Sequence, residues 1–328
     1  MIRLGFLGIR HVHAPAYGVA FRNDVEWGPV YDADFEAAEV FARGLGTPVA
    51  RSREEVLASV DAVICAGTNA EHFSMTESAL RARKHVLCEK PLVLTPSEGE
   101  ALLDAARVCE VRLMTAFPCP YAPGFQKLQS RVQAGELGLL RAICATNHGR
   151  CPGGWFVDPA ESGGGALVDH TVHVADLLFR LLGEEPTTVF AKTNHLHWGL
   201  PVEDSALVTL QYPSGLFATL DASWSRPGSY KTWGDVTLRV VGDAGSAELN
   251  LFSQAFDVYQ DQHRQWGYGS NLDQLMAKEF LQAIAEKREP LTSGEDGLRA
   301  CRVMWAAQRS AQSGRPEPLE ASVPIGPS

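Results

Sequence analysis

The hydrophobic positions of the first 120 residues fall into short apolar runs separated by longer amphipathic segments. Helical spacing of apolar residues predicts helices at 35–45, 70–81 and 97–108. Strands that are apolar throughout and separated by helices are typical of a doubly wound parallel sheet with both faces covered. The apolar runs predict strands at 2–7, 25–31, 62–66, 85–88 and 111–116.

The pattern changes after residue 120, where strands begin to follow strands. Alternating apolar positions predict strands with one buried face at 206–212, 216–224 and 236–240, which is typical of an open, mainly antiparallel sheet. A further strand is predicted at 141–146, and helices are predicted at 125–134, 166–182, 271–286 and 296–312. We therefore expect an α/β protein with two domains, a parallel-sheet domain at 1–120 and an α+β domain at 121–328.

Composition narrows the class of protein. With 328 residues, 45% hydrophobic and 21% charged, the chain is typical of globular proteins with two cores. A net charge of −10 argues against nucleic acid or an anionic membrane as a partner. Seven scattered cysteines give no disulfide framework or zinc motif. No signal peptide or membrane span is recognisable, so we expect a cytoplasmic protein.

The turn after the first predicted strand is a candidate dinucleotide site. In a doubly wound sheet this turn binds the pyrophosphate of a dinucleotide, commonly through a G-x-G-x-x-G pattern. Gly8 occupies the first glycine position of that pattern. Asp32, 24 residues later, is placed to accept ribose hydroxyls and to repel a 2′-phosphate, which favours NAD over NADP. Arg10 and His13 replace the second and third glycines, so Arg10 either points away or contacts a phosphate. The alternative is an ordinary turn without a ligand.

Lys90 follows a predicted strand, at the sheet edge where ligands bind in α/β proteins. A lysine in such a cleft can pass a proton or polarise an alcohol, whereas the alternative is a surface lysine in a loop.

The predicted helix at 166–182 carries one polar stripe of Asp169, His173, Asp176 and Arg180 on an otherwise apolar surface. Such a stripe is either an internal ion-pair ladder or the wall of a cleft, and an aspartate one turn before a histidine would orient it. The preceding run 163–165 is all glycine and favours the cleft, because a bare loop lets a ligand approach.

Aromatic and histidine residues add further candidates. Trp155 and Phe156 could form an apolar wall against a sugar ring or belong to the core. Histidines come in close pairs, but no zinc motif accompanies them, so we predict no metal site.

These segments together resemble the Gfo/Idh/MocA family of sugar and cyclitol dehydrogenases. The resemblance covers nearly the whole chain and rests on the Leu4–Gly8 turn, Asp32, the Thr68–His72 segment, Glu89-Lys90-Pro91, the run from Gly163 to Asp169 with His173, and Asp296-Gly297-Leu298. Arg10 departs from the glycine-rich turn, and Thr68 stands where the family commonly has proline.

The resemblance implies an N-terminal Rossmann domain that binds NAD, an α+β domain whose open sheet packs between subunits, and a homodimer or homotetramer. It implies a catalytic group of Lys90, Asp169 and His173. We predict cofactor contacts from Gly8, Arg10, His11, Asp32, Thr68, Asn69, His72, Glu89 and Lys90. We predict substrate contacts from Trp155, Phe156, Asp169, His170 and His173.

The predicted function is hydride transfer between a nicotinamide cofactor and a secondary alcohol or ketone of a sugar or cyclitol. Either His173 or Lys90 takes the hydroxyl proton. The alternatives are a non-catalytic nucleotide-sensing protein of the same fold and an oxidoreductase with a tightly held cofactor.

Overall fold

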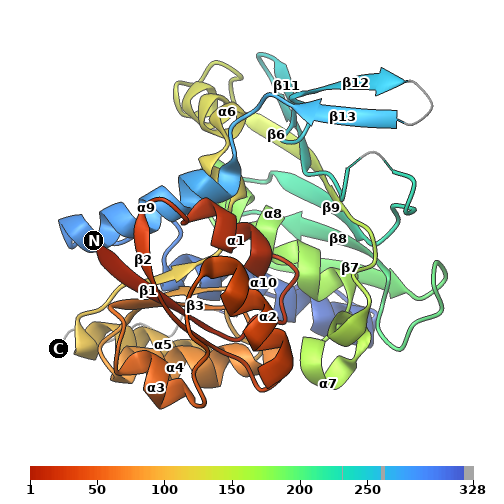
Figure 1. Ribbon diagram of the computed structural model, residues 1–328. Coiled ribbons are helices and arrows are strands. Elements are labelled where there is room, and N and C mark those ends of the chain that lie inside the picture. The colour runs from red at the N-terminus through yellow and green to blue at the C-terminus, as the bar shows by residue number, and fades with distance from the viewer. Residues whose placement is uncertain (231, 260–262, 321–328) are drawn as a thin grey trace.

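The N-terminal third forms a five-stranded parallel sheet in a computed structural model that describes residues 1–230, 232–259 and 263–320 (Figure 1). The chain first moves from β1 to β2 and then crosses back to β3, so the strand order reverses at β1 and β3. The crevice outside the carboxyl ends of such strands is where doubly wound folds bind ligands. In spatial order the strands are β2 (Val25–Tyr31), β1 (Ile2–Leu7), β3 (Ala62–Cys65), β4 (His85–Cys88) and β5 (Leu113–Thr115).

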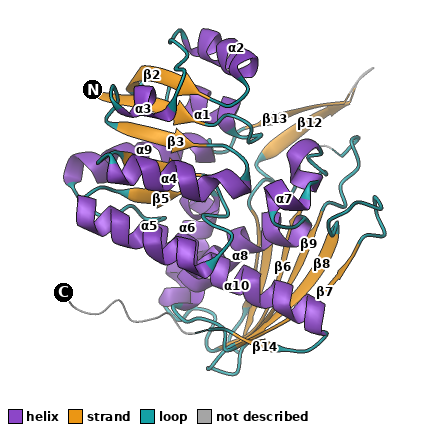
Figure 2. Cartoon of the chain, turned by 90° about the horizontal axis from the view of Figure 1, so that it is seen from below, coloured by secondary structure: helices purple, strands orange, loops and turns teal. Residues whose placement is uncertain are grey.

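Helices cover both faces of this sheet, as Figure 2 shows, because successive side chains of each apolar strand point to opposite faces. One face packs against α3 (Arg53–Leu57), α4 (His72–Arg81) and α5 (Pro96–Cys109). The other packs against α1 (Ala14–Ala20), α2 (Phe35–Leu45) and α9 (Leu272–Glu286). The predicted parallel sheet is confirmed. The short helices α1 and α3 were not predicted, because five to seven residues are too few to show a helical period.

Helix α9 joins the first sheet although it follows the second sheet in sequence. Phe280 of α9 packs edge-on against Phe21, with ring centroids 6.3 Å apart. The C-terminal part of the chain therefore completes the N-terminal core. The predicted domain boundary between residues 120 and 121 stays a prediction.

The second sheet has seven strands, of which β6 and β9 run parallel and the other neighbours antiparallel. This confirms the predicted, mainly antiparallel sheet. Strand β7 was not predicted, since Val189 and Ala191 are its only fully buried side chains. A separate pair, β12 (Ala255–Tyr259) and β13 (His263–Gly267), was also not predicted. In spatial order the strands are β11 (Ser246–Asn250), β10 (Thr237–Gly242), β6 (Leu140–His148), β9 (Phe217–Ser223), β8 (Ser205–Gln211), β7 (Thr188–Asn194) and β14 (Glu317–Pro318).

Two helices connect the sheets. Helix α8 (Ala166–Leu182) packs on one face of the second sheet, and α10 (Gly294–Ser313) packs against α8 and β7 as well as against α5 and β5 (Figure 2). One continuous apolar cluster runs from the α4 and α5 face of the first sheet to the covered face of the second. This shared core fixes the carboxyl edge of the first sheet against α8. The remaining α-helices of the described residues are α6 (Pro123–Gln133) and α7 (Pro159–Ser162).

The first turn of α8 is capped by a residue from a distant loop. Glu203 accepts hydrogen bonds from the backbone N–H groups of Gly165 (2.8 Å) and Leu167 (3.2 Å), and its own carbonyl accepts from Ala166 (2.9 Å). A carboxylate here satisfies free N–H groups and complements the helix dipole. The approach requires glycine at 165, because a Cβ there would lie 1.9 Å from the carbonyl oxygen of Glu203.

Replacing Gly165 by alanine should therefore destabilise the protein by about 1–3 kcal/mol, as an overpacked buried site does. Gly44→Ala is the matched control, because Gly44 is an exposed residue in the last turn of α2 with nothing within 4 Å of its added Cβ. The control should stabilise by up to about 1 kcal/mol. Urea unfolding of the two variants measures both changes, and equal effects of the same sign would contradict this account.

Candidate active site

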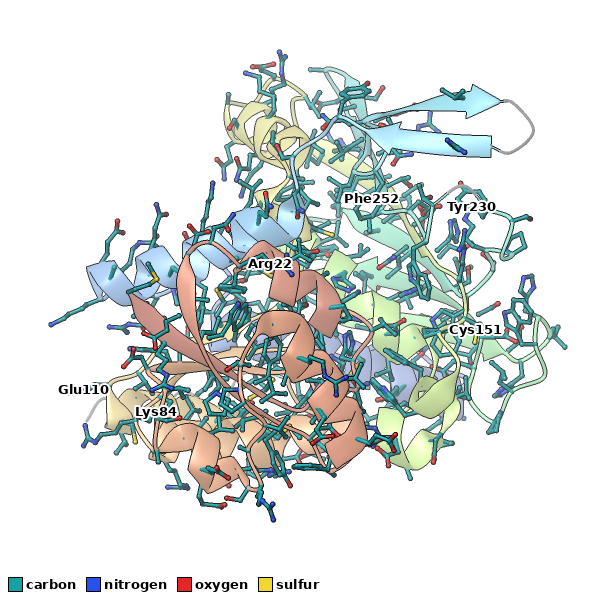
Figure 3. All side chains as sticks on the ribbon, in the orientation of Figure 1. Arg22, Lys84, Glu110, Cys151, Tyr230 and Phe252 are labelled. Atoms are coloured by element: carbon teal, nitrogen blue, oxygen red, sulfur yellow. The ribbon has the colours of Figure 1, made fainter. Side chains whose placement is uncertain are left out.

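A pocket opens between the carboxyl edge of the first sheet and the start of α8. Predicted site residues from both halves of the chain line it, namely His11, Lys90, Phe156, Asp169, His170 and His173. Residues that were not predicted complete the lining, chiefly His13, Asn147, His148, Trp233, Asp235 and Phe252. Phe252 comes from the segment between β11 and β12 (Figure 3).

Lys90 and Asp169 form a buried ion pair across the two halves of the chain. Lys90 follows β4 and is 3% exposed, and Asp169 lies in the first turn of α8 and is 8% exposed. The Lys90 ammonium donates to the carboxylate of Asp169 and lies 3.4 Å from its carbonyl oxygen. The surface-lysine alternative is thereby excluded.

The second oxygen of Asp169 is also occupied. It accepts from the indole N–H of Trp224 at 3.0 Å and lies 3.2 Å from Nε2 of His170. Burial alone would raise the pKa of Asp169, but the charge of Lys90 and the contact with His170 outweigh it and hold the pKa well below the usual range. Asp169 is therefore an anion that positions Lys90 and His170, whereas the sequence suggested that it would orient His173.

His173 lies one turn further along α8 and faces the same pocket. Its ring meets Phe117 edge-on at 5.8 Å, and its Nδ1 is buried without a hydrogen-bond partner among the described residues. Burial, assisted by the charge of Lys90, holds the pKa of His173 well below its usual value. His173 is therefore neutral at physiological pH and has a lone pair that can accept a proton.

The polar stripe of α8 divides into two parts. Its first half forms a wall of the pocket, and its second half forms an internal ion-pair ladder. Asp169 and His173 line the pocket, whereas Asp176 pairs with Arg180 at 2.8 Å, and Arg180 reaches Asp296 at 3.2 Å. Burial raises the pKa of Asp176 to about 6, although Arg180 opposes the shift. The second half of the stripe is an internal ion-pair ladder.

The three glycines before α8 allow close packing against other parts of the protein. A Cβ at Gly163 would meet Leu94 at 2.6 Å, and one at Gly165 would meet Glu203. Neither glycine lines the pocket. Close contacts with other parts of the protein therefore account for these glycines, and the approach of a ligand to this run stays a prediction.

The two predicted aromatic residues differ in position. Phe156 lines the pocket. Trp155 stacks on the ring of Phe156, with ring centroids 3.8 Å apart, and donates its indole N–H to the carbonyl of Arg10 at 3.0 Å. The side chain of Arg10 pairs with Glu161 of α7 at 3.2 Å. Arg10 therefore lies outside the lining of this pocket, and its contact with a cofactor phosphate stays a prediction.

The remaining predicted cofactor residues lie along the carboxyl edges of β1 to β4. Gly8 has φ +78°, and a Cβ there would lie 2.7 Å from Gly67, so only glycine lets the two turns meet. Asp32 is 4% exposed and is fixed by N–H groups of Ile9 (2.8 Å) and Asp34 (2.9 Å). A carboxylate that accepts two bonds retains lone pairs for ribose hydroxyls.

Beside this turn, buried polar atoms lack partners among the described residues. They are Thr68 Oγ1, Asn69 Oδ1 and His72 Nε2. Their other polar groups are used, since Asn69 donates to the Ser162 carbonyl at 2.8 Å and His72 Nδ1 lies 2.8 Å from the Pro91 carbonyl. Buried polar groups without partners are typical of ligand sites, and this edge fits a dinucleotide.

Glu89 is fully buried and lies outside the pocket lining. Its carboxylate accepts from Tyr17 and from Nδ1 of His13 (3.0 Å), and it lies 3.2 Å from Nδ1 of His11. Burial opposes ionisation, but His11 and His13 outweigh it and hold the pKa of Glu89 well below its usual value. Burial also lowers the pKa of His11. Neither Tyr17 nor His13 was predicted to be in this cluster.

Comparison with known proteins agrees with this architecture. Residues 2–117 match the model of the oxidoreductase family with an NAD-binding Rossmann fold, and residues 125–248 match the Gfo/Idh/MocA C-terminal domain. Inositol 2-dehydrogenase of Rhizobium meliloti is 30% identical over 96% of this chain and 98% of its own. Myo-inositol 2-dehydrogenase of Thermotoga maritima is 28% identical over 80% of each. The chain belongs to the Gfo/Idh/MocA family of oxidoreductases, and its N-terminal domain is an NAD-binding Rossmann domain.

Solved structures share the fold. The structure of GenD2 from gentamicin A biosynthesis, in complex with NAD, superposes with a TM-score of 0.89 at 24% identity over 98% of this chain and 97% of its own. Among the described residues, the helices are all too short or too polar to cross a membrane.

His148, at the end of β6, is held between two carboxylates in the pocket wall. Its Nδ1 lies 2.9 Å from Asp235, which also binds Arg226, and its Nε2 lies 3.0 Å from Asp221. Burial opposes protonation, but the two aspartates outweigh it and raise the pKa of His148 to about 9. The imidazolium is therefore part of the folded structure at neutral pH.

His148→Gln should lower the free energy of unfolding by about 3 kcal/mol at most, in a pH-dependent way. The pKa of His148 in the folded protein, about 9, exceeds the ordinary 6.5. The protonated ring therefore contributes its full stabilisation below pH 6.5, and this contribution is lost as the pH rises through 9. Urea unfolding at pH 6 and pH 9.5 measures this, with the exposed His195→Gln as control. If the native protein and His148→Gln differed in free energy of unfolding by the same amount at both pH values, His148 would not be the protonated group assigned here.

Proposed function

We propose that this oxidoreductase transfers a hydride between NAD and a secondary alcohol or ketone of a sugar or cyclitol, with Lys90, Asp169 and His173 as its catalytic group. The observation that carries the proposal is the buried Lys90–Asp169 pair facing the same pocket as a neutral His173. The names of the inositol dehydrogenase relatives support the class of substrate. NAD, when bound, accepts the hydride from the substrate carbon.

The residues of the chain divide the remaining work. An ammonium that is paired with a carboxylate has no lone pair, so Lys90 acts as the donor that stabilises the developing alkoxide. His173 has a free lone pair and takes the hydroxyl proton, which makes it the base. Asp169 touches Lys90 and His170 and keeps both in place. The oxidation is then balanced, with the hydride going to NAD and the proton to His173.

The lining of the pocket supports a polyol substrate. Asn147 Oδ1 and His170 Nδ1, which have no partner among the described residues, offer polar groups, and Trp233 and Phe156 offer apolar faces. Sugar rings present hydroxyls at the edge and C–H groups on the faces, so such a mixed lining suits them. Asp32 supports NAD over NADP, because its charge would repel a 2′-phosphate.

We also propose a homodimer or homotetramer that forms through the open face of the second sheet. Leu207 and Phe217 lie on neighbouring strands of that sheet and are 55% and 49% exposed. All seven cysteines are free thiols, which supports a cytoplasmic location.

Lys90→Met should lower kcat for a polyol substrate by about 10²–10⁴-fold, the usual contribution of one acid–base or oxyanion-stabilising group. NADH binding, followed by the fluorescence of the bound nicotinamide, should remain nearly unchanged. Lys127→Met, which removes an exposed lysine on α6, is the matched control and should keep full activity. Unchanged turnover in Lys90→Met would remove Lys90 from the mechanism. Failure of the native protein to bind NADH would contradict the function itself.

A further inference from the structure

His11, His13 and Glu89 form a cluster outside the proposed catalytic group, although His11 and Glu89 are among the predicted cofactor contacts. Nδ1 of His13 lies 3.0 Å and Nδ1 of His11 lies 3.2 Å from the same carboxylate oxygen, Oε1 of Glu89. One ligand atom from each of the three side chains lies within 4.8 Å of the others. Glu89 and the His11 ring are fully buried, whereas the His13 side chain is 39% exposed.

The two separations from Oε1 of Glu89 match the spacing of ligands around one transition-metal ion, and the two histidine ligand atoms lie within 4.8 Å of each other. Nitrogen and oxygen ligands lie about 2.0–2.2 Å from zinc, so neighbouring ligand atoms are about 3.0–3.6 Å apart. Two imidazoles and one carboxylate are also the ligand set of many open metal sites, in which the remaining positions hold water or substrate.

Hydrogen bonding within the cluster satisfies Nδ1 of His11 toward only one of its two neighbours. Its Nδ1 accepts the backbone N–H of His13 at 3.3 Å, and the same nitrogen faces Oε1 of Glu89. A neutral ring nitrogen carries either a proton or a lone pair, so it cannot accept from one group and donate to the other. When it donates to Glu89, the backbone N–H of His13 loses this acceptor, and when it accepts from His13, two lone-pair atoms face each other. A cation that both atoms bind would remove that repulsion and would take the lone pair that the His13 N–H otherwise uses.

Further contacts hold the cluster in place. Tyr17 donates to Oε1 of Glu89, the oxygen that also faces both histidines, and the backbone N–H of Lys90 donates to Oε2 at 3.0 Å. Such bonds to a ligand carboxylate orient it toward a metal ion. The ammonium of Lys90 is neutralised by Asp169, which limits its repulsion of a cation.

We propose that His11, His13 and Glu89 bind one divalent transition-metal ion, such as Zn²⁺. Both histidines also line the pocket, so the open coordination positions of the ion face the pocket, where water or a substrate hydroxyl can occupy them. The proposal departs from the expectation of no metal site. The sequence shows the His-x-His pair, but the third ligand lies 76 residues away from His13 and meets it only in the fold.

The test is a Zn²⁺ titration of the full-length protein after removal of metal with a chelator, in competition with a chromophoric zinc indicator. The native protein should bind one Zn²⁺ per chain at this site and melt at a higher temperature with Zn²⁺ than without. His13→Ala, which replaces the partly exposed ligand, should weaken this binding at least about tenfold and lose the thermal shift.

The chain offers a matched control, because His195 and His197 form a second His-x-His pair in an exposed turn. The His195→Ala/His197→Ala variant should bind Zn²⁺ as the native protein does. No binding by the native protein, equal binding by His13→Ala, or loss of binding only in the control variant would each overturn the proposal. The titration involves no turnover, so its outcome is independent of the proposed dehydrogenase activity.

Discussion

The buried contact between Lys90 and Asp169 is the constraint on which the rest of the site depends. Removing each of the two charges from water costs free energy. Their mutual attraction offsets that cost only if the geometry of the pair is fixed. The two residues are contributed by different halves of the chain, one at the end of β4 and the other in the first turn of α8. The pair can therefore form only if the two sheets keep a fixed relation to each other.

The packing provides that fixed relation. Helix α10 contacts elements of both sheets, and a single apolar cluster continues from one sheet to the other. Glu203, which caps α8 against Gly165, fixes the first turn of the helix on which Asp169 lies. Structural residues far from the chemistry thus determine where the charges of the pocket lie.

The sequence predicted the parts of this protein that depend on local pattern. Apolar runs identified the parallel strands, and helical spacing placed Asp169 and His173 on one face of α8. Position at a strand end identified Lys90, because the carboxyl edge of a parallel sheet follows directly from strand order.

Features that depend on distant contacts could not be predicted. Asn147 and His148 end a strand whose neighbours are set by topology, and Asp235 reaches His148 from a loop almost 90 residues away. The sequence does not show the close contact of Glu203 with Gly165, so the glycines before α8 were interpreted only as space for a ligand. Sequence spacing also could not show which half of the polar stripe lines the pocket and which half forms ion pairs. Arg180 of that stripe pairs with Asp296, which lies on another helix, α10.

A double-mutant cycle on Lys90 and Asp169 tests the central claim most directly. Lys90→Met, Asp169→Asn and the double variant are compared by free energy of unfolding and by kcat. Each single change leaves a buried group without its partner, so the account predicts a coupling energy of about 1–3 kcal/mol and a double variant no slower than Lys90→Met alone. Strictly additive losses in both quantities would show that the two residues act independently and would contradict the account.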